Sequence, residues 1–314
     1  FLGWQLNSNN YAAGSTFTMG SSAITFTAQW SGVYYAITYA LNGGAGTTPT
    51  QADVESGGSF TTAAAPTKNG FTFTGWSDGV TTTNASTSIT NLSENKTLTA
   101  QWAIAAPGIP GTPTAVPSDG GATITIVAPS SGGTPSSYTV TASPGGATCT
   151  VTSPGTSCTI SSLTNGTAYT FTSTATNSAG SSASSSSASS AVTPASVPSE
   201  PISVSGSGTG GSALIEWSTP SSNGGSAITD YIVEYSVDGS NTWSTFSDGV
   251  STNTSATVTG LTAGSSYIFR VTAKNVIGSS LPSISTPTIS TLPTAPSVTS
   301  LTAGNEQVSV SWSA

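Results

Sequence analysis

Two tryptophan motifs recur in the first third of the chain with one spacing. Gly3-Trp4 is followed by Ala28-Gln29-Trp30, and Gly75-Trp76 is followed by Ala100-Gln101-Trp102. The matching tryptophans stand 72 positions apart in both cases (76 − 4 and 102 − 30). Internal similarity at a fixed period indicates an array of small modules.

The second of these units has the pattern of short strands separated by turns. Within residues 35–41, large apolar side chains recur at every second position, at Ile37, Tyr39 and Leu41, which is the pattern of a half-buried strand. Asn42-Gly43-Gly44 supplies the left-handed conformations of a turn. We expect a second strand over 71–74 that ends at Gly75, and a closing strand over 97–102.

Three segments of this unit resemble the Listeria–Bacteroides repeat, the B-repeat type of internalin-like surface proteins. They are Tyr39-Ala40-Leu41-Asn42-Gly43-Gly44, Pro66-Thr67-Lys68-Asn69-Gly70-Phe71-Thr72-Phe73-Thr74-Gly75-Trp76 and Leu98-Thr99-Ala100-Gln101-Trp102. The resemblance covers residues 34–102 and half of the preceding unit. It implies a small β-grasp-like fold that recurs in tandem on bacterial cell-surface proteins.

A second repeat begins after a proline-rich stretch. The segment from Leu163 to Phe171 is echoed by the segment from Leu261 to Phe269, at an offset of 98 (261 − 163). Asn177-Ser178-Ala179-Gly180 is echoed by Asn275-Val276-Ile277-Gly278 at the same offset. Units of this length with many short strands and Gly, Pro and Ser turns indicate β-sandwiches.

These units resemble fibronectin type III domains. That family has a tryptophan on its second strand, as at Trp217, a tyrosine corner near the start of its sixth strand, and an Asn-x-x-Gly turn between its last two strands. The first unit departs from the pattern, because Ile126 stands at the position of Trp217. An apolar residue there keeps the core apolar, so the expected fold is unchanged.

We therefore expect a mainly β chain with tandem small β-grasp-like repeats followed by fibronectin type III β-sandwiches, arranged as beads on a string. The predicted domains are 1–32 (C-terminal part of a repeat unit), 33–103 (complete repeat), 104–195 and 196–293 (two sandwiches) and 294–314 (truncated start of a further sandwich). Proline-rich joints between them favour extended backbone and predict semi-rigid spacers. Both ends cut through a unit, which predicts a fragment of a longer protein.

The run from Ser181 to Ser190 lies where the last strand of the first sandwich is expected. Composition leaves two alternatives open, a degenerate edge strand or a flexible loop.

Cys149 and Cys158 are the only cysteines of the chain. Pro154 and Gly155 lie between them and predict a turn that brings two strands side by side. The alternatives are a pair of reduced buried thiols and a redox-active pair. A redox-active pair needs nearby cations or a Cys-x-x-Cys spacing, and the sequence has neither. We expect a structural disulfide, which implies an oxidising extracellular setting.

Composition excludes several classes of function. The chain has no histidine, which excludes a Ser-His-Asp triad and a histidine-ligated metal site. Four Lys and Arg residues cannot build the basic stripe that nucleic acid requires. Apolar runs are too short to span a membrane. No residue is assigned to catalysis, to a metal or to a cofactor.

For the aromatic and acidic residues we prefer structural roles, in core packing and as surface charges, to roles in binding or catalysis. The tryptophans at repeat positions are expected to fill cores rather than to bind sugars, and Trp243 to pack on a sheet face. The core set is Trp4, Trp30, Trp76, Trp102, Trp217 and Trp312. Asp230 and Glu234 lie on one face of a strand but too far apart along it for a glycosidase pair, so we expect solvated charges.

The sequence favours a non-catalytic extracellular stalk or adhesion segment of a large bacterial surface or secreted protein. The alternatives are an accessory spacer or carbohydrate-binding region of a secreted polysaccharide-degrading enzyme, a specific binding module, and a self-assembling filament. Expected partners are host or matrix proteins, polysaccharides, or the cell wall through regions outside this segment. The oligomeric state stays open.

Overall fold

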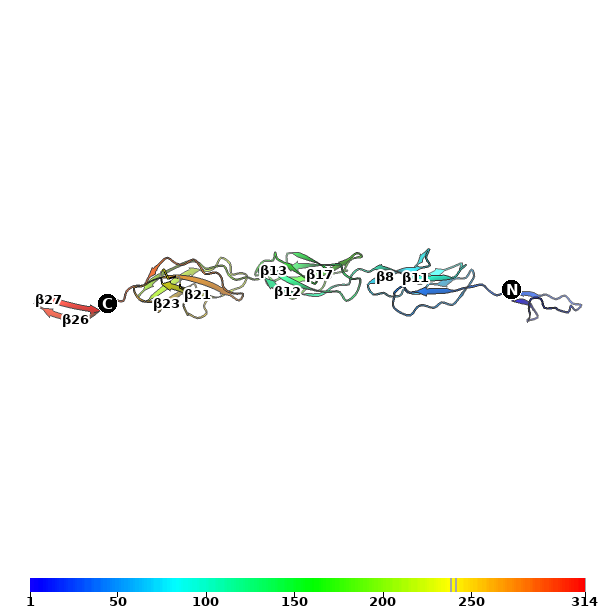
Figure 1. Cartoon of the computed structure of the whole chain (residues 1–314), viewed down its shortest axis with the longest axis horizontal. Coiled ribbons are helices and arrows are strands. Elements are labelled where there is room, and N and C mark those ends of the chain that lie inside the picture. The colour runs from blue at the N-terminus through cyan, green and yellow to red at the C-terminus, as the bar shows by residue number, and fades with distance from the viewer. Residues whose placement is uncertain (238, 241, 314) are drawn as a thin grey trace. The chain divides into compact units, whose positions relative to one another are not determined.

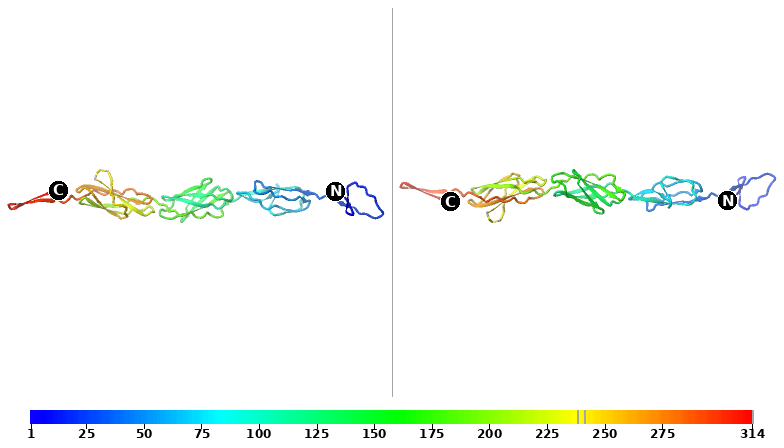
Figure 2. Two further views of the ribbon diagram at one scale, coloured as in Figure 1. Left: turned by 90° about the horizontal axis from the view of Figure 1, so that it is seen from below. Right: turned by 90° about the horizontal axis from the view of Figure 1, so that it is seen from above.

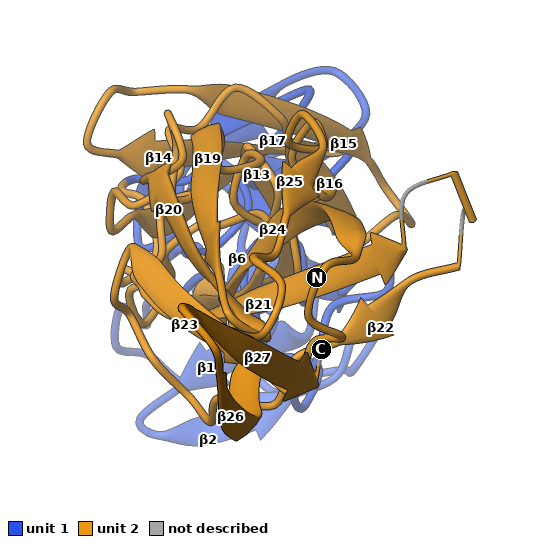
Figure 3. Cartoon of the chain, turned by 90° about the vertical axis from the view of Figure 1, so that its left-hand side faces the viewer, with its two compact units in different colours: residues 1–109, 129–136, 175–183 blue, residues 110–128, 137–174, 184–314 orange. Residues whose placement is uncertain are grey.

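The computed structural model describes residues 1–237, 239–240 and 242–313. Within these ranges the chain forms strands and turns, with no helix, so the prediction of a mainly β chain is confirmed. The chain divides into two compact units (Figure 3). The first unit comprises residues 1–109, 129–136 and 175–183, and the second comprises residues 110–128, 137–174 and 184–314.

A four-stranded sheet forms the centre of the complete repeat (Figure 1). Its strands, in spatial order, are β5 (Ile37–Ala40), β11 (Lys96–Ile104), β8 (Phe71–Ser77) and β9 (Thr82–Thr83). β5 runs parallel to β11, whereas β8 runs antiparallel to it. Two strand pairs flank this sheet: β4 (Tyr34–Tyr35) with β6 (Val54–Glu55), and β7 (Phe60–Thr61) with β10 (Ser88–Ile89).

Trp76 lies at the centre of the repeat core, where it is fully buried. Its ring packs edge-on against Tyr39, with 4.8 Å between ring centroids. The indole nitrogen donates to the carbonyl of Ala63 at 2.9 Å, and the amide of Ala63 donates to the Tyr39 hydroxyl at 3.0 Å. Two large aromatic residues therefore fill the core and also satisfy both main-chain groups of one loop residue.

Gly75 does not end its strand, contrary to the prediction. β8 continues through Gly75 to Ser77, and Gly75 pairs with Gln101 in the ladder. Gly75 has φ +146°, and a Cβ atom there would lie 3.0 Å from the carbonyl oxygen of Thr83. Glycine is thus present because β9 approaches the backbone closely, which a side chain would prevent.

The first 32 residues form a smaller sheet in the order β2-β1-β3. Its strands are β1 (Gly3–Leu6), β2 (Asn9–Tyr11) and β3 (Thr27–Gln29). Trp4 and Trp30 occupy the repeat positions of Trp76 and Trp102, yet they are 43% and 70% exposed. The described residues 1–32 contain no counterpart of β5, whose Tyr39 covers Trp76 in the complete repeat. The core prediction is therefore wrong for Trp4 and Trp30.

The last hairpin overturns the same prediction for Trp312. β26 (Ser297–Gly304) and β27 (Gln307–Ser313) pair with each other (Figure 2), and both strands are exposed along their length. Trp312 is 65% exposed, while Trp217 on the matching strand of the second sandwich is 6% exposed. A tryptophan at a repeat position is buried only where the sheets of its module surround it.

The first sandwich consists of two antiparallel sheets. One sheet has the order β12 (Gly111–Ser118), β13 (Gly121–Val127), β16 (Ser157–Ile160). The other has the order β15 (Thr148–Thr152), β14 (Ser137–Ser143), β17 (Thr170–Asn177), β18 (Gly180–Ser181). Ile126, which replaces the family tryptophan, is buried with 4% of its surface exposed.

The second sandwich repeats this arrangement. One sheet has the order β19 (Ile202–Thr209), β20 (Ser212–Ser218), β23 (Ser255–Thr259), and the other β22 (Ser244–Thr245), β21 (Ile228–Val237), β24 (Ser266–Asn275), β25 (Ile289–Ser290). Both sandwiches contain the tyrosine corner implied by the resemblance. The amide of Thr164 donates to the Tyr169 hydroxyl at 3.1 Å, and the amide of Thr262 donates to the Tyr267 hydroxyl at 3.0 Å.

The serine-rich run after β17 is neither a regular edge strand nor a loose loop. The amide of Ser186 donates to the carbonyl of Ser173 at 2.8 Å, as in a β-ladder. The return bond differs, because the amide of Ser173 donates to the hydroxyl of Ser186, at 2.9 Å, rather than to a carbonyl. Ser189 makes the same exchange with Phe171, and Ser182 makes it with Ala175. We call this pattern the hydroxyl ladder.

The second sandwich has the same hydroxyl ladder along β24. Ser280, Ser283 and Thr286 pair in this way with Ala273, Val271 and Phe269, with hydroxyl–amide distances of 3.0 Å in each case. All six hydroxyl-bearing residues of the two ladders are buried. Each hydroxyl oxygen therefore takes the place of a carbonyl oxygen and satisfies an amide that would otherwise be buried without a partner.

Ser283→Ala tests the hydroxyl ladder. The substitution leaves the buried amide of Val271 without an acceptor, so we expect a loss of about 1–3 kcal/mol in the free energy of unfolding of the second sandwich. Ser285→Ala is the matched control, because Ser285 is exposed on the same segment, and we expect a change within about 0.5 kcal/mol. Hydrogen exchange of peptides from residues 196–289 as a function of denaturant measures both. Equal effects of the two variants would contradict the role assigned to the hydroxyl.

Candidate functional site

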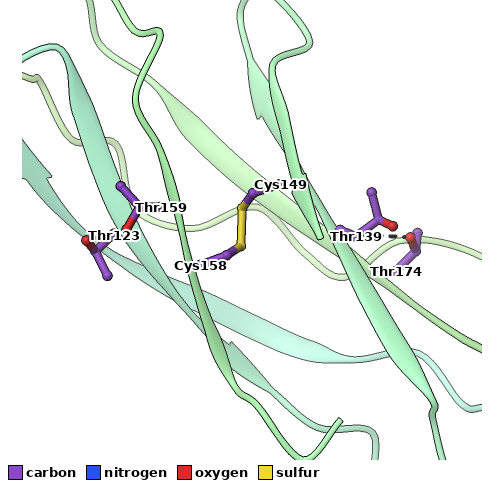
Figure 4. The surroundings of a disulfide bond; sticks show 6 residues. All are labelled: Thr123, Thr139, Cys149, Cys158, Thr159 and Thr174. Atoms are coloured by element: carbon purple, nitrogen blue, oxygen red, sulfur yellow. Dashed lines mark hydrogen bonds between the residues drawn. A yellow bond between two sulfur atoms is a disulfide. The ribbon is translucent and has the colours of Figure 1, made fainter. Parts of the chain in front are cut away.

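The disulfide joins the two sheets of the first sandwich. Cys149 on β15 and Cys158 on β16 are bonded, with 6.2 Å between their Cα atoms (Figure 4). β15 is an edge strand of one sheet and β16 an edge strand of the other. The predicted pair thus connects the sheets at their edge, where strand pairing does not.

Threonines reinforce each sheet beside this disulfide (Figure 4). The hydroxyls of Thr123 and Thr159 lie 3.1 Å apart across β13 and β16. The Thr174 hydroxyl donates to the carbonyl of Thr139 at 3.5 Å, across β17 and β14. Neutral hydroxyl contacts therefore link neighbouring strands of both sheets beside the disulfide.

An ion cluster fastens the turn after β8 in the complete repeat. The Asp78 carboxylate accepts from the amides of Val80 and Thr81 at 3.0 and 2.8 Å, and from the Lys96 ammonium at 2.8 Å. Lys96 also contacts Glu94 at 2.9 Å. The hydrogen bond from Lys96, helped by the two amides, holds the pKa of Asp78 well below its usual range, and the same contact raises the pKa of Lys96.

Trp243 packs on the outer face of the second sandwich, as predicted. The Arg270 guanidinium lies over its ring, 4.1 Å from the centroid, and donates to Glu234 at 2.8 Å. Glu234 is therefore an ion-pair partner rather than a free charge. Asp230 accepts from the amide of Ser251 at 3.0 Å, so it fixes a loop.

Over the ranges that the structure describes, no three His, Cys, Asp or Glu residues gather as a metal site. Nor do the described residues include a helix long and apolar enough to cross a membrane.

The strand-end asparagine of the first sandwich holds the segment that leads into that sandwich. The Asn177 side-chain amide donates to the carbonyl of Ala105 at 2.8 Å and to that of Thr134 at 3.3 Å. Its oxygen accepts from the amide of Ala179 at 2.9 Å. One side chain thus ties the incoming linker, a loop and a turn together, and we call this contact the asparagine clasp.

The second sandwich has the same asparagine clasp. The Asn275 side-chain amide donates to the carbonyls of Ser196 and Asn223 at 2.8 and 2.9 Å, and its oxygen accepts from the amides of Ile277 and Gly278. Asn275 is almost fully buried. The prolines of the first two joints are buried as well. They are Pro107, Pro110, Pro113, Pro194, Pro198 and Pro201.

Sequence reasoning located these asparagines but assigned them only to a turn. The linker residues that they contact lie 72 and 79 positions away along the chain, and a local sequence pattern cannot predict contacts at that separation. The signal that could have found them is the repetition of Asn-x-x-Gly at the offset of 98, combined with the proline-rich joint before each unit.

Comparison with known families matches most of the chain. The fibronectin type III domain matches residues 110–192 and 196–289, which together exceed half of the chain. The Listeria-Bacteroides repeat domain matches residues 35–101. The order of the two families is the order that the sequence motifs predict.

Two curated relatives share short regions with this chain. "Protein turtle" of Drosophila melanogaster is 33% identical over 99 residues, which cover 32% of this chain and 6% of that protein. A "Putative Gly-rich membrane protein" of Evansella cellulosilytica is 33% identical over 109 residues, which cover 33% of this chain and 12% of that protein. The chain therefore spans a small part of the length of these relatives.

Among solved structures, a crystal structure of titin domains is 23% identical and covers 67% of this chain and 73% of that chain, with a TM-score of 0.39.

Reduction of the disulfide should weaken the first sandwich alone. The bond closes a short loop, with a sequence separation of 9, so the chain-entropy argument gives a loss of about 2.5–3 kcal/mol. Hydrogen exchange of peptides from residues 110–192, with and without reductant, measures the loss. Residues 196–289 contain no cysteine and serve as the control within the same molecule. Unchanged protection of the first sandwich would contradict this role.

Asp78→Asn tests the ion cluster through its pH dependence. The folded-state pKa of Asp78 is depressed, so its stabilisation is present above about pH 4 and is lost as pH falls toward the folded pKa. We expect the variant to be less stable at pH 7 by about 1–2 kcal/mol and this difference to shrink at pH 2, measured by thermal unfolding. Asp53→Asn, at an exposed position of the same module, is the control. A difference that does not change with pH would refute the ion-pair explanation.

Proposed function

This chain belongs to the fibronectin type III family, and we propose that it is a non-catalytic extracellular stalk or adhesion segment of a large multidomain bacterial surface or secreted protein. The pairing of fibronectin type III domains with a Listeria-Bacteroides repeat supports the bacterial surface setting. The disulfide supports an oxidising compartment.

The asparagine clasps are the observation that carries this proposal. A stalk needs joints that do not collapse, and both complete sandwiches bind the linker that enters them through a side chain and buried prolines. Short linkers fixed in this way limit how far successive modules can fold back on one another, which favours an extended chain over one globule.

The same reasoning sets the module boundaries that we propose. They are 1–32 and 33–103 for the repeat units, 104–195 and 196–293 for the sandwiches, and 294–314 for the start of a further sandwich. The partners that such a segment would present or contact are host or matrix proteins and polysaccharides, which bind without a deep pocket when several modules act together.

Small-angle scattering of the purified 314-residue chain tests the stalk. A compact globule of this length would have a radius of gyration of roughly 20 Å, and we expect a value well above it that does not depend on protein concentration. A value near that of a globule, or concentration-dependent growth into filaments, would overturn the proposal.

A binding array distinguishes adhesion from spacing within the proposal. Matrix proteins and polysaccharides are presented to the intact chain. Saturable binding that is also measured with the Asp78→Asn and Asp53→Asn variants would show that the segment acts in adhesion. Absence of binding would assign spacing. A catalytic domain in the same reading frame would instead assign the accessory role in a secreted enzyme.

A further inference from the structure

Two modules of different fold carry the same four-residue turn. Lys68-Asn69-Gly70-Phe71 belongs to the repeat, and Thr164-Asn165-Gly166-Thr167 belongs to the first sandwich. In both turns the fourth amide donates to the first carbonyl, at 3.1 and 3.2 Å, and the glycine is left-handed, with φ +79° and +82°. We call these two turns the Asn-Gly turns.

Each Asn-Gly turn lies against a glycine pair from the sandwich that follows it in the chain. Gly70 faces Gly132-Gly133 within the first compact unit, and a Cβ atom on Gly70 would lie 3.6 Å from the carbonyl oxygen of Gly132. Gly166 faces Gly224-Gly225 within the second unit, and a Cβ atom on Gly166 would lie 3.2 Å from Cα of Gly225. Backbone therefore meets backbone in both places.

Side chains are excluded most strictly on the receiving loop. A Cβ atom on Gly225 would overlap the amide nitrogen of Gly166, and one on Gly133 would overlap the carbonyl oxygen of Ala105. Gly224 and Gly225 also have φ +71° and +83°. Glycine is thus required at these positions by close approach as well as by conformation.

The linker is bonded to both partners of this contact. On the side of the turns, the amide of Ala105 donates to the carbonyl of Gly70 at 3.0 Å, and the amide of Gly166 donates to the carbonyl of Pro194 at 2.9 Å. On the side of the sandwiches, the asparagine clasps bind the carbonyls of Ala105 and Ser196. Each linker therefore lies between a turn and a clasp.

We propose that the glycine pair in the loop between the second and third strands of each sandwich is a docking seat for an Asn-Gly turn of the preceding module. The partner is another module of this chain, of either fold, because the seat contacts the turn backbone and not the body of the module. This inference goes beyond the stalk function, since it assigns the surface through which neighbouring modules contact each other and does not depend on where the protein resides.

The chain contains a matched control for this proposal. Thr262-Ala263-Gly264-Ser265 is the equivalent turn of the second sandwich, with φ +80° at Gly264 and a 3.2 Å turn hydrogen bond. A Cβ atom on Gly264 would meet nothing closer than Cα of Pro293, at 4.0 Å. Gly166→Ala and Gly264→Ala therefore carry the same backbone strain, but only Gly166→Ala disturbs a seat.

Amide exchange in the full chain tests the seat. The amide of Ser196 is bonded to the carbonyl of Gly224 at 2.8 Å, next to the seat. We expect its exchange to be faster by about tenfold in Gly166→Ala and to change less than about twofold in Gly264→Ala. Equal exchange in the two variants overturns the proposal.

Residual dipolar couplings give a second readout that does not depend on stability. In the unaltered chain and in Gly264→Ala, the amides of 110–192 and 196–289 should fit one alignment tensor, and in Gly166→Ala they should require two. If residues 110–192 and 196–289 require separate alignment tensors in the unaltered chain, the docking-seat proposal is wrong. If Gly166→Ala fails to fold, Gly225→Ala against Gly249→Ala repeats the comparison, because Gly249 has φ +82° and open space around it. Failure of the seat would leave the scattering and binding tests of the stalk unaffected.

Discussion

Both sandwiches depend on hydrogen-bond acceptors for the main-chain amides of one long strand, β17 in the first and β24 in the second. β17 and β24 lie in the interior of their sheets, so every amide on them needs an acceptor that water cannot supply. The segment that follows each strand is not a regular strand, yet it meets this need by presenting a buried hydroxyl opposite successive amides. At the two ends of these strands, side chains satisfy main-chain groups of neighbouring segments. The hydroxyl of the tyrosine corner accepts from a loop amide, and the asparagine clasp donates to a linker carbonyl.

Much of the fold could be predicted, because the repeat offsets identify equivalent positions in different modules of this chain. A motif that recurs at a fixed offset is stronger evidence for a module than the average preferences of its residues. The strand at Ile37 lies within the segment that alternation predicts, and Trp217 is buried on the second strand of its sandwich, as the resemblance implies. The strand that holds Trp76 instead continues past Gly75, where the sequence predicted its end. Burial at Trp4, Trp30 and Trp312 could not be predicted, because an equivalent position does not guarantee equivalent neighbours. The reach of Asn177 and Asn275 to their linkers is a long-range contact that periodicity does not encode.

The chain has few charged residues, and three of its four cationic side chains make structural contacts. Lys96 and Arg270 are ion-paired, and Lys68 donates to the carbonyl of Asn42 while it lies over the rings of Phe71 and Trp102. Neutral hydrogen bonds carry the rest of the polar contacts, and they are little affected by salt. The modules therefore depend on shape and hydrogen-bond geometry more than on ionic conditions, which suits a segment whose surroundings change.

The hydroxyl ladder also explains how a tract of low complexity can belong to a folded sandwich. The ladder hydroxyls belong to Ser182, Ser186 and Ser189 in one sandwich, and to Ser280, Ser283 and Thr286 in the other. Residues between them face solvent, as the 76% exposure of Leu281 and 89% exposure of Ile284 illustrate. Side chains at those exposed positions are not packed into the core, so substitutions there should change stability little. A tract of low complexity can therefore complete a sandwich through a buried hydroxyl at about every third residue.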